Sequence, residues 1–213
     1  MTAALAAALA LATGNDLAVS SRSDFDEAES ALAALTALEP DEDLQATAAQ
    51  KDPGPTPLLG TPHTAETYSA LLWNGERFER HGVSWGARLL FLARASGGRP
   101  DRLAAGVQAG EAMRATWPPE PTTTPVAGLT VDTVSSGVCA AVSDGLEGEA
   151  VEQVAELAAA LMLITPAAPG SELAGLHAGH ALASGWLAVQ LHRSGLVAAP
   201  GTSAEVLATR ETP

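Results

Sequence analysis

The chain has 213 residues, 46% of them apolar, which is enough for one hydrophobic core. Alanine and leucine supply most of this apolar content and aromatic residues are few, so we expect an all-α protein. The formal net charge of −14 at pH 7 repels phosphate backbones and anionic lipid, which argues against nucleic acid and membrane surfaces as partners.

The first part of the chain is predicted to hold two helices and a long loop. Residues 2–13 are alanine-rich and lack the positive charges that precede a signal sequence, so we expect a helix in a cytoplasmic protein. Residues 24–38 carry apolar side chains at helical spacing and acidic side chains in the first turn, which indicates an amphipathic helix. Residues 39–63 contain five prolines and are predicted to be a loop with room for one short helix near 44–49.

The rest of the chain alternates helical or buried segments with glycine and proline breaks. Asn74-Gly75 is predicted to end a helix, and the prolines of 117–129 predict a second loop. Helical or buried segments are expected at 64–73, 83–95, 100–116, 130–144, 148–164 and 170–194. Together with a disordered tail at 202–213, they predict one helical domain over 1–213.

Common motifs of phosphate binding and nucleophilic catalysis are absent from the sequence. It has no glycine-rich phosphate loop, no GxSxG elbow and no cysteine dyad. Cys139 is the only cysteine, which excludes an intramolecular disulfide, and its apolar neighbours predict a buried, inert thiol. No stretch approaches about 18 apolar residues, so no transmembrane helix is expected.

Four segments resemble, in the same order, the helical domain of the MmgE/PrpD family. They are PTPLLGTPHTAETYSALLWNG (55–75), HGVSWGARLLFLARASGGRPDRLAAGVQAGEAM (81–113), VSSGVCAAVSDGLEGEAVEQV (134–154) and GLHAGHALASGWLAVQLHRSGLVAAPG (175–201). The family includes 2-methylcitrate dehydratase, cis-aconitate decarboxylase and iminodisuccinate epimerase. The resemblance therefore implies homodimers that act on a small-molecule substrate with no cofactor. Family members also have an α+β lid domain, for which this chain has no room, and their active site lies between the two domains.

The resemblance places candidate site residues after the Asn-Gly pair. Glu76 and Glu79 fall where the family has aspartates, and His81 falls at its histidine. Near residue 130, where the family has another histidine, this sequence has none. The lysine that precedes the LHAG segment in the family would fall at Ala174, and Lys51, in a distant loop, is not expected to replace it.

His177 and His180 lie one turn apart in the last helical segment, and three interpretations compete for them. Nearby glycines let helices approach closely, so both rings can serve packing by bonding backbone carbonyls. They can instead donate hydrogen bonds or exchange protons with a carboxylate ligand. A metal pair is the third interpretation, but no third ligand stands at a suitable spacing, so no metal is expected. We expect His177 at the mouth of a pocket and His180 deeper in helix packing.

His81 has two interpretations as well. At the N-terminus of the following helix it would have a lowered pKa and, with His177, would form the catalytic pair; otherwise it is an exposed loop or capping residue. Asp132 or Thr133 can likewise contact substrate or cap the helix at 130–144. Substrate contacts are expected from Glu79, Trp85, Thr133, Ser135, Ser136 and His180.

Two hypotheses for function follow. The first is a small lyase, isomerase or cyclase that moves a proton on a carboxylate- or carbonyl-bearing metabolite, in a biosynthetic pathway. The second is a non-catalytic relative of the family that acts as a dimeric scaffold or as a partner of a second protein subunit, because a domain without its lid exposes an apolar face.

Overall fold

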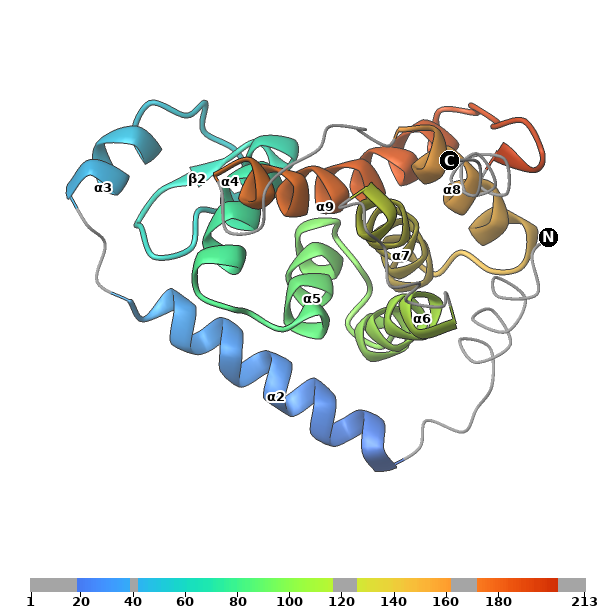
Figure 1. The fold of residues 1–213 in the computed structure, drawn as a ribbon, viewed down its shortest axis with the longest axis horizontal. Helices are drawn as coiled ribbons and strands as arrows, with labels where there is room; N and C mark the ends of the chain where they lie inside the picture. The colour runs from blue at the N-terminus through green and yellow to red at the C-terminus, as the bar shows by residue number, and fades with distance from the viewer. Residues whose placement is uncertain (1–18, 39–41, 117–125, 162–171, 203–213) are drawn as a thin grey trace.

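The computed structural model describes residues 19–38, 42–116, 126–161 and 172–202, and within them it is all-α, as predicted (Figure 1). The described helices are α2 (Val19–Thr36), α3 (Glu42–Ala48), α4 (Thr67–Arg80), α5 (Trp85–Ala95), α6 (Leu103–Thr116), α7 (Val126–Asp144), α8 (Glu149–Ala160) and α9 (Glu172–Arg193). The two strands in these ranges are β1 (Thr56–Pro57) and β2 (Thr64–Ala65), which pair antiparallel. The helix expected at 2–13 and nearly all of the tail lie outside the described residues.

The long helix α9 runs across the upper side of the bundle in Figure 1 and packs against α4, α7 and α8. It runs antiparallel to α4, because Tyr68 meets Trp186 while Gly75, further along α4, meets Gly179, nearer the start of α9. It runs parallel to α7, because Ser136 and Asp144 on α7 face Gly185 and Arg193 in the same order. The first turns of α7 and α9 therefore lie at the same end of the molecule as the last turn of α4.

Glycines set the distance between these helices. A Cβ added at Gly75 would lie 2.0 Å from the Cα of Gly179, and a Cβ added at Gly185 would lie 2.5 Å from the Cβ of Ser136. Both distances are shorter than any ordinary contact, so larger side chains would force the helices apart. We call Gly75, Gly179 and Gly185 the glycine seam.

The predicted helix end at Asn74-Gly75 is wrong, because α4 continues to Arg80. Asn74 is fully buried and its side chain bonds other backbone groups: Oδ1 accepts from the Leu59 N–H and Nδ2 donates to the Pro57 carbonyl, both at 2.9 Å. Residues that usually break helices are thus used here for contacts between segments.

Both predicted loops also need correction. Within 39–63 the structure places α3, two residues earlier than the short helix expected there, and β1. Helix α7 begins at Val126, so the last residues of the predicted 117–129 loop are helical. Asp132 and Thr133 consequently lie inside α7 and do not cap it. Among the described helices, none has the length and hydropathy needed to cross a membrane.

The amphipathic helix expected at 24–38 is present as the second half of α2. Ala28, Leu32 and Leu35 are buried on the side that packs against α5, and Glu29 pairs with Arg94 of α5. Cys139 is fully buried in the core, and burial raises the pKa of its thiol to about 12, as expected for an inert cysteine.

Candidate functional site

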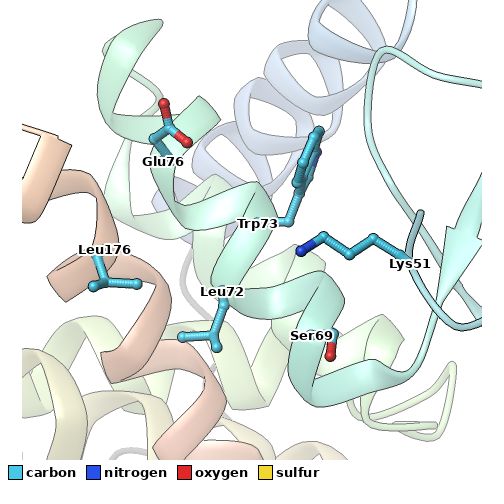
Figure 2. Close-up of a pocket in the computed structure, with 6 residues that line it drawn as sticks. All are labelled: Lys51, Ser69, Leu72, Trp73, Glu76 and Leu176. Carbon is cyan, nitrogen blue, oxygen red and sulfur yellow. The ribbon is translucent and has the colours of Figure 1, made fainter. Parts of the chain in front are cut away.

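A cavity of about 440 Å³ lies along α4 (Figure 2). Lys51 lines it from the segment after α3, and Leu176 lines it from α9. The other lining residues lie at spacings of three and four on one face of α4 and are Ser69, Leu72, Trp73 and Glu76. We call this the Lys51 cavity.

The position of Lys51 corrects the sequence analysis, which placed it far from the LHAG segment. Lys51 lines the same cavity as Leu176, the leucine of that segment, and its Nζ lies 5.8 Å from the centre of the Trp73 ring. Contacts between residues far apart in the sequence bring Lys51 to α4. A small apolar cluster packs the end of α3, the two strands and the start of α4 together, and its buried members are Ala48, Leu58, Ala65 and Ala70.

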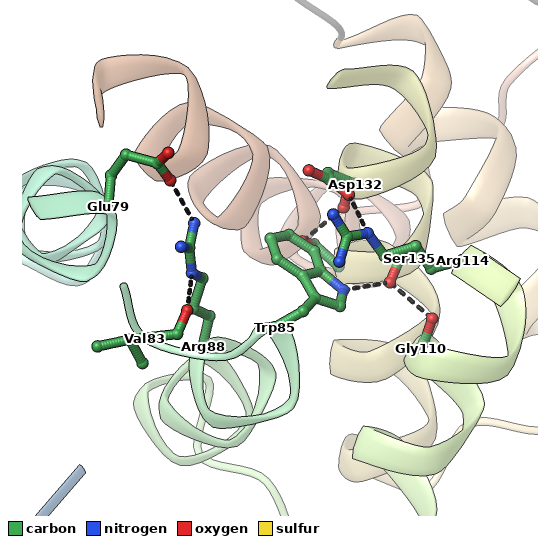
Figure 3. Close-up of polar contacts among 9 residues, drawn as sticks. Glu79, Val83, Trp85, Arg88, Gly110, Arg114, Asp132 and Ser135 are labelled. Atoms are coloured by element: carbon green, nitrogen blue, oxygen red, sulfur yellow. Dashed lines mark hydrogen bonds and ion pairs between the residues drawn. The ribbon is translucent and has the colours of Figure 1, made fainter. Parts of the chain in front are cut away.

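A second polar group lies where the end of α4, the start of α5, the end of α6 and the early turns of α7 meet (Figure 3). We call it the Asp132 cluster, and its members are Glu79, Trp85, Arg88, Arg114, Asp132 and Ser135. Three of them, Glu79, Trp85 and Ser135, were predicted to contact substrate. Arg88, Arg114 and Asp132 complete the group.

Two ion pairs hold the charged members of the Asp132 cluster. Arg114 Nε lies 2.8 Å from Asp132 Oδ1, and Arg88 Nη1 lies 3.0 Å from Glu79 Oε2. Arg88 also donates from Nε to the Val83 carbonyl at 2.8 Å, which fixes its guanidinium at the start of α5. The Asp132 side chain is 20% exposed and Arg88 13% exposed, so both charged groups are largely shielded from solvent.

A buried hydrogen-bond chain holds Trp85 beside Arg114. Trp85 Nε1 donates to Ser135 Oγ at 3.0 Å, and Ser135 Oγ donates to the Gly110 carbonyl at 2.7 Å. These bonds fix the indole ring, and the Arg114 guanidinium lies 5.0 Å from its centre. Ser135 is fully buried, so it positions Trp85 and does not itself face a ligand.

The carboxyl of Asp132 titrates far above the ordinary range for aspartate. Burial raises its pKa from 3.8 to about 6, although Arg114 and Arg88 act in the opposite direction and Glu79 adds to the rise. Nearby Glu111 also has a raised pKa, mainly through burial and then through Asp24, while Arg114 lowers it. A carboxyl with a pKa of about 6 exchanges its proton close to neutral pH, which suits a general acid or base.

His177 is buried in the helix packing whereas His180 is only half-buried, so the prediction that His180 lies deeper than His177 is wrong. His177 is 4% exposed, and burial together with His180 lowers its pKa, which keeps the ring neutral. His180 Nε2 lies 3.2 Å from the Leu161 carbonyl and 3.1 Å from Ser184 Oγ. Both contacts fit the packing interpretation that the sequence analysis left open for His180.

His81 is exposed and directly follows α4, with its backbone N–H donating to the Arg77 carbonyl at 3.0 Å. It therefore stands at a helix C-terminus, and the predicted N-terminal position is wrong; the residue that caps α5 is Ser84. Neither His81 nor His177 lines the Lys51 cavity, so the structure does not bring these two histidines to that pocket.

The remaining predicted substrate contacts are buried. Ser136 lies against Gly185 of α9, and its hydroxyl donates to the Asp132 carbonyl at 2.8 Å within the same helix. Thr133 is 1% exposed. In the part of the chain that the structure describes, no three histidine, cysteine, aspartate or glutamate side chains are grouped closely enough to hold a metal ion.

The chain matches no protein-family model, no curated protein and no solved structure. The resemblance to the MmgE/PrpD family thus stays a prediction, and the function must be argued from the two polar sites.

Proposed function

We propose that this protein is a small lyase, isomerase or cyclase, resembling the MmgE/PrpD enzymes, that moves a proton on a carboxylate- or carbonyl-bearing metabolite at the Asp132 cluster. The observation that carries the proposal is a carboxyl with a pKa of about 6 held beside two arginines. General bases are most effective when their pKa lies near the working pH.

The chemistry assigns distinct roles to the charged residues. Ionised Asp132 takes a proton from the carbon next to the activating group, and the electron pair of the broken C–H bond moves into the carbonyl or carboxylate oxygens. Arg88 and Arg114 bind those oxygens, because a guanidinium matches a carboxylate with two parallel hydrogen bonds. Glu79 is 42% exposed, so a substrate carboxylate can replace it on Arg88 at small energetic cost.

In this proposal Asp132 takes the proton-handling role that the sequence analysis gave to His81 and His177. The exposed His81 and the buried His177 both lie outside the Asp132 cluster. The predicted contacts Glu79, Trp85 and Ser135 remain part of the proposed site. Glu79 is the partner of Arg88 that a substrate can replace, and Trp85 and Ser135 hold the side chains around Arg114 in position.

Deuterium incorporation tests the proposal without knowledge of the substrate. A metabolite extract incubated with the protein in D₂O should contain a metabolite whose mass rises by one deuterium, because a base that removes a C–H proton returns a solvent deuteron. Asp132→Asn should abolish this incorporation. Asp101→Asn, an exposed aspartate paired with Arg99, is the matched control and should behave as the unaltered protein. Incorporation that survives Asp132→Asn would contradict the proposal.

Exposed apolar side chains support the second function, a non-catalytic dimeric scaffold or partner subunit. Leu196 and Val197, just after α9, are 51% and 68% exposed, and His180 serves helix packing. Light scattering at micromolar concentration should then give twice the 21.5 kDa chain mass, and replacing Leu196 and Val197 together with serine should return the mass to one chain. A single-chain mass for the unaltered protein would contradict the scaffold.

A further inference from the structure

We propose that the Lys51 cavity is a second ligand site, separate from the Asp132 cluster, and that it binds a small monocarboxylate with an apolar body. The two sites share no lining residue.

Lys51 differs from the described arginines in how its charge is paired. Seven arginines with described side chains form ion pairs with carboxylates: Arg80, Arg88, Arg94, Arg99, Arg102, Arg114 and Arg193. Lys51, the only lysine of the chain, has no such pair with a described carboxylate, although the chain has 25 acidic residues. Its Nζ instead lies over the ring of Trp73, at the cavity (Figure 2).

Residues that line the cavity carry hydrogen-bond donors without acceptors among the described residues. Trp73 Nε1 is buried with no acceptor among the described residues, and Ser69 Oγ bonds none of them. The one carboxylate in the lining, Glu76, already pairs with Arg80 one turn further along α4. The Ser69 hydroxyl and the Lys51 ammonium are therefore the polar groups of the wall without a partner among the described residues, which favours a ligand that brings acceptor oxygens and a negative charge.

The apolar part of the cavity lining suits a hydrocarbon chain. Leu72, Trp73 and Leu176 supply its hydrocarbon, and Leu176 is 43% exposed although it lies among buried residues of α9. From Ser69 to Glu76 the stripe on α4 spans about 10 Å, and the cavity volume of about 440 Å³ lies in the range of small-ligand pockets. A medium-chain carboxylate fits this length, with its head on Lys51 and its chain over the leucines.

Calorimetric titration with octanoate tests the proposal on the full chain. Octanoate should bind saturably, and Lys51→Gln should weaken it about tenfold, since the lost charge-assisted hydrogen bond contributes about 1.4 kcal/mol. Arg99→Gln removes an exposed cation far along the chain and should leave the affinity unchanged. 1-Octanol, which has a neutral head, should bind about tenfold more weakly than octanoate. Octylammonium should bind more weakly still, because its positive head is repelled by Lys51.

Two further variants separate this site from the proposed function. Asp132→Asn should leave octanoate binding intact while it abolishes deuterium incorporation. Glu76→Gln should tighten octanoate binding about twofold, because it removes the one negative charge of the cavity lining. Equal affinity of octanoate and octanol, unchanged binding to Lys51→Gln, or no saturation below about 10 mM would each overturn the proposal.

Acylation of Lys51 gives an independent readout, because an amine-reactive ester modifies no other side chain amine in this sequence. Peptide mass mapping should show that saturating octanoate slows the acylation of Lys51 while the rate at the chain's terminal amine stays constant. An unchanged rate at Lys51 would show that the carboxylate does not lie on this lysine, and the proposal would be wrong.

Discussion

The glycine seam and the Asp132 cluster position the helices of the same bundle by opposite means. In the seam, missing side chains let α9 approach α4 and α7 until backbone atoms meet. In the cluster, charged and polar side chains from four helices meet and bond one another. Packing in the seam depends on shape, so an added side-chain atom is not tolerated there. The interactions of the cluster depend on charge, so they change with pH as Asp132 ionises. Variants in the seam should therefore lose stability through steric overlap, whereas variants in the cluster should change how stability depends on pH.

The largest expected effect is in the seam. Gly75→Ala adds one methyl group 2.0 Å from the Cα of Gly179, so α4 and α9 must separate along their shared length. We expect the free energy of unfolding to fall by about 3 kcal/mol or more, which is a large overpacking cost.

Gly82→Ala is the comparison for Gly75→Ala, because a Cβ at Gly82 meets nothing within 4 Å and only its φ of +59° is strained. That variant should lose about 1 kcal/mol, and urea unfolding measures both values. Equal losses in the two variants would show that the close contact of α4 with α9 is not what limits stability.

The sequence predicted the helices better than the contacts between them. Helical spacing in 24–38 predicted a helix with a buried face, and 148–164 was correctly expected to hold a helix, because such periodicity is local. The end assigned to α4 was wrong because Asn74 and Gly75 are used in contacts with Pro57, Leu59 and Gly179, which no local pattern reveals.

The candidate site was predicted only in part for the same reason. Glu79, Trp85 and Ser135 were named individually, yet nothing in their spacing shows that they meet Arg88 and Arg114. The raised pKa of Asp132 depends on burial created by several helices. Lys51 was dismissed because sequence distance was taken for distance in space.

The next largest effect is in the cluster, where Asp132→Asn should stabilise the protein at pH 7. The pKa of Asp132 is about 6 in the folded state and 3.8 ordinarily, so the folded protein binds more protons between these values. Its free energy of unfolding therefore falls as the pH rises from about 4 to 6, by roughly 1–3 kcal/mol.

The amide in Asp132→Asn carries no charge, so this variant should keep the stability that the carboxylate loses above pH 6. Urea unfolding of both proteins at pH 4.5 and pH 7 measures the difference. If the difference in free energy of unfolding between the two proteins does not grow with pH, ionisation of Asp132 does not destabilise the folded state.

His180→Ala should cost less, about 1–2 kcal/mol, through the lost hydrogen bond to the Leu161 carbonyl at the end of α8. The same variant removes one of the two causes that lower the pKa of His177. NMR titration of His177 should therefore show its pKa move back toward 6.5, with burial keeping it below that value. An unchanged pKa would mean that burial alone governs His177. Ser194→Ala, at the exposed end of α9, is a neutral control.

The smallest effect on stability is expected for Glu79→Gln, which tests the exposed edge of the Asp132 cluster. Its ion pair with Arg88 is partly solvated, so the free energy of unfolding should change by no more than about 0.5 kcal/mol. The pKa of Asp132 should nevertheless fall, because Glu79 is one of the causes that raise it and Arg88 loses its competing partner. Carbon NMR titration of the Asp132 carboxyl measures this shift, and Glu76→Gln, three residues earlier on the cavity face, should leave it in place. If Glu79→Gln leaves the pKa of Asp132 unchanged, the carboxyl is controlled by burial and the arginines alone, and the edge of the cluster contributes nothing to its chemistry.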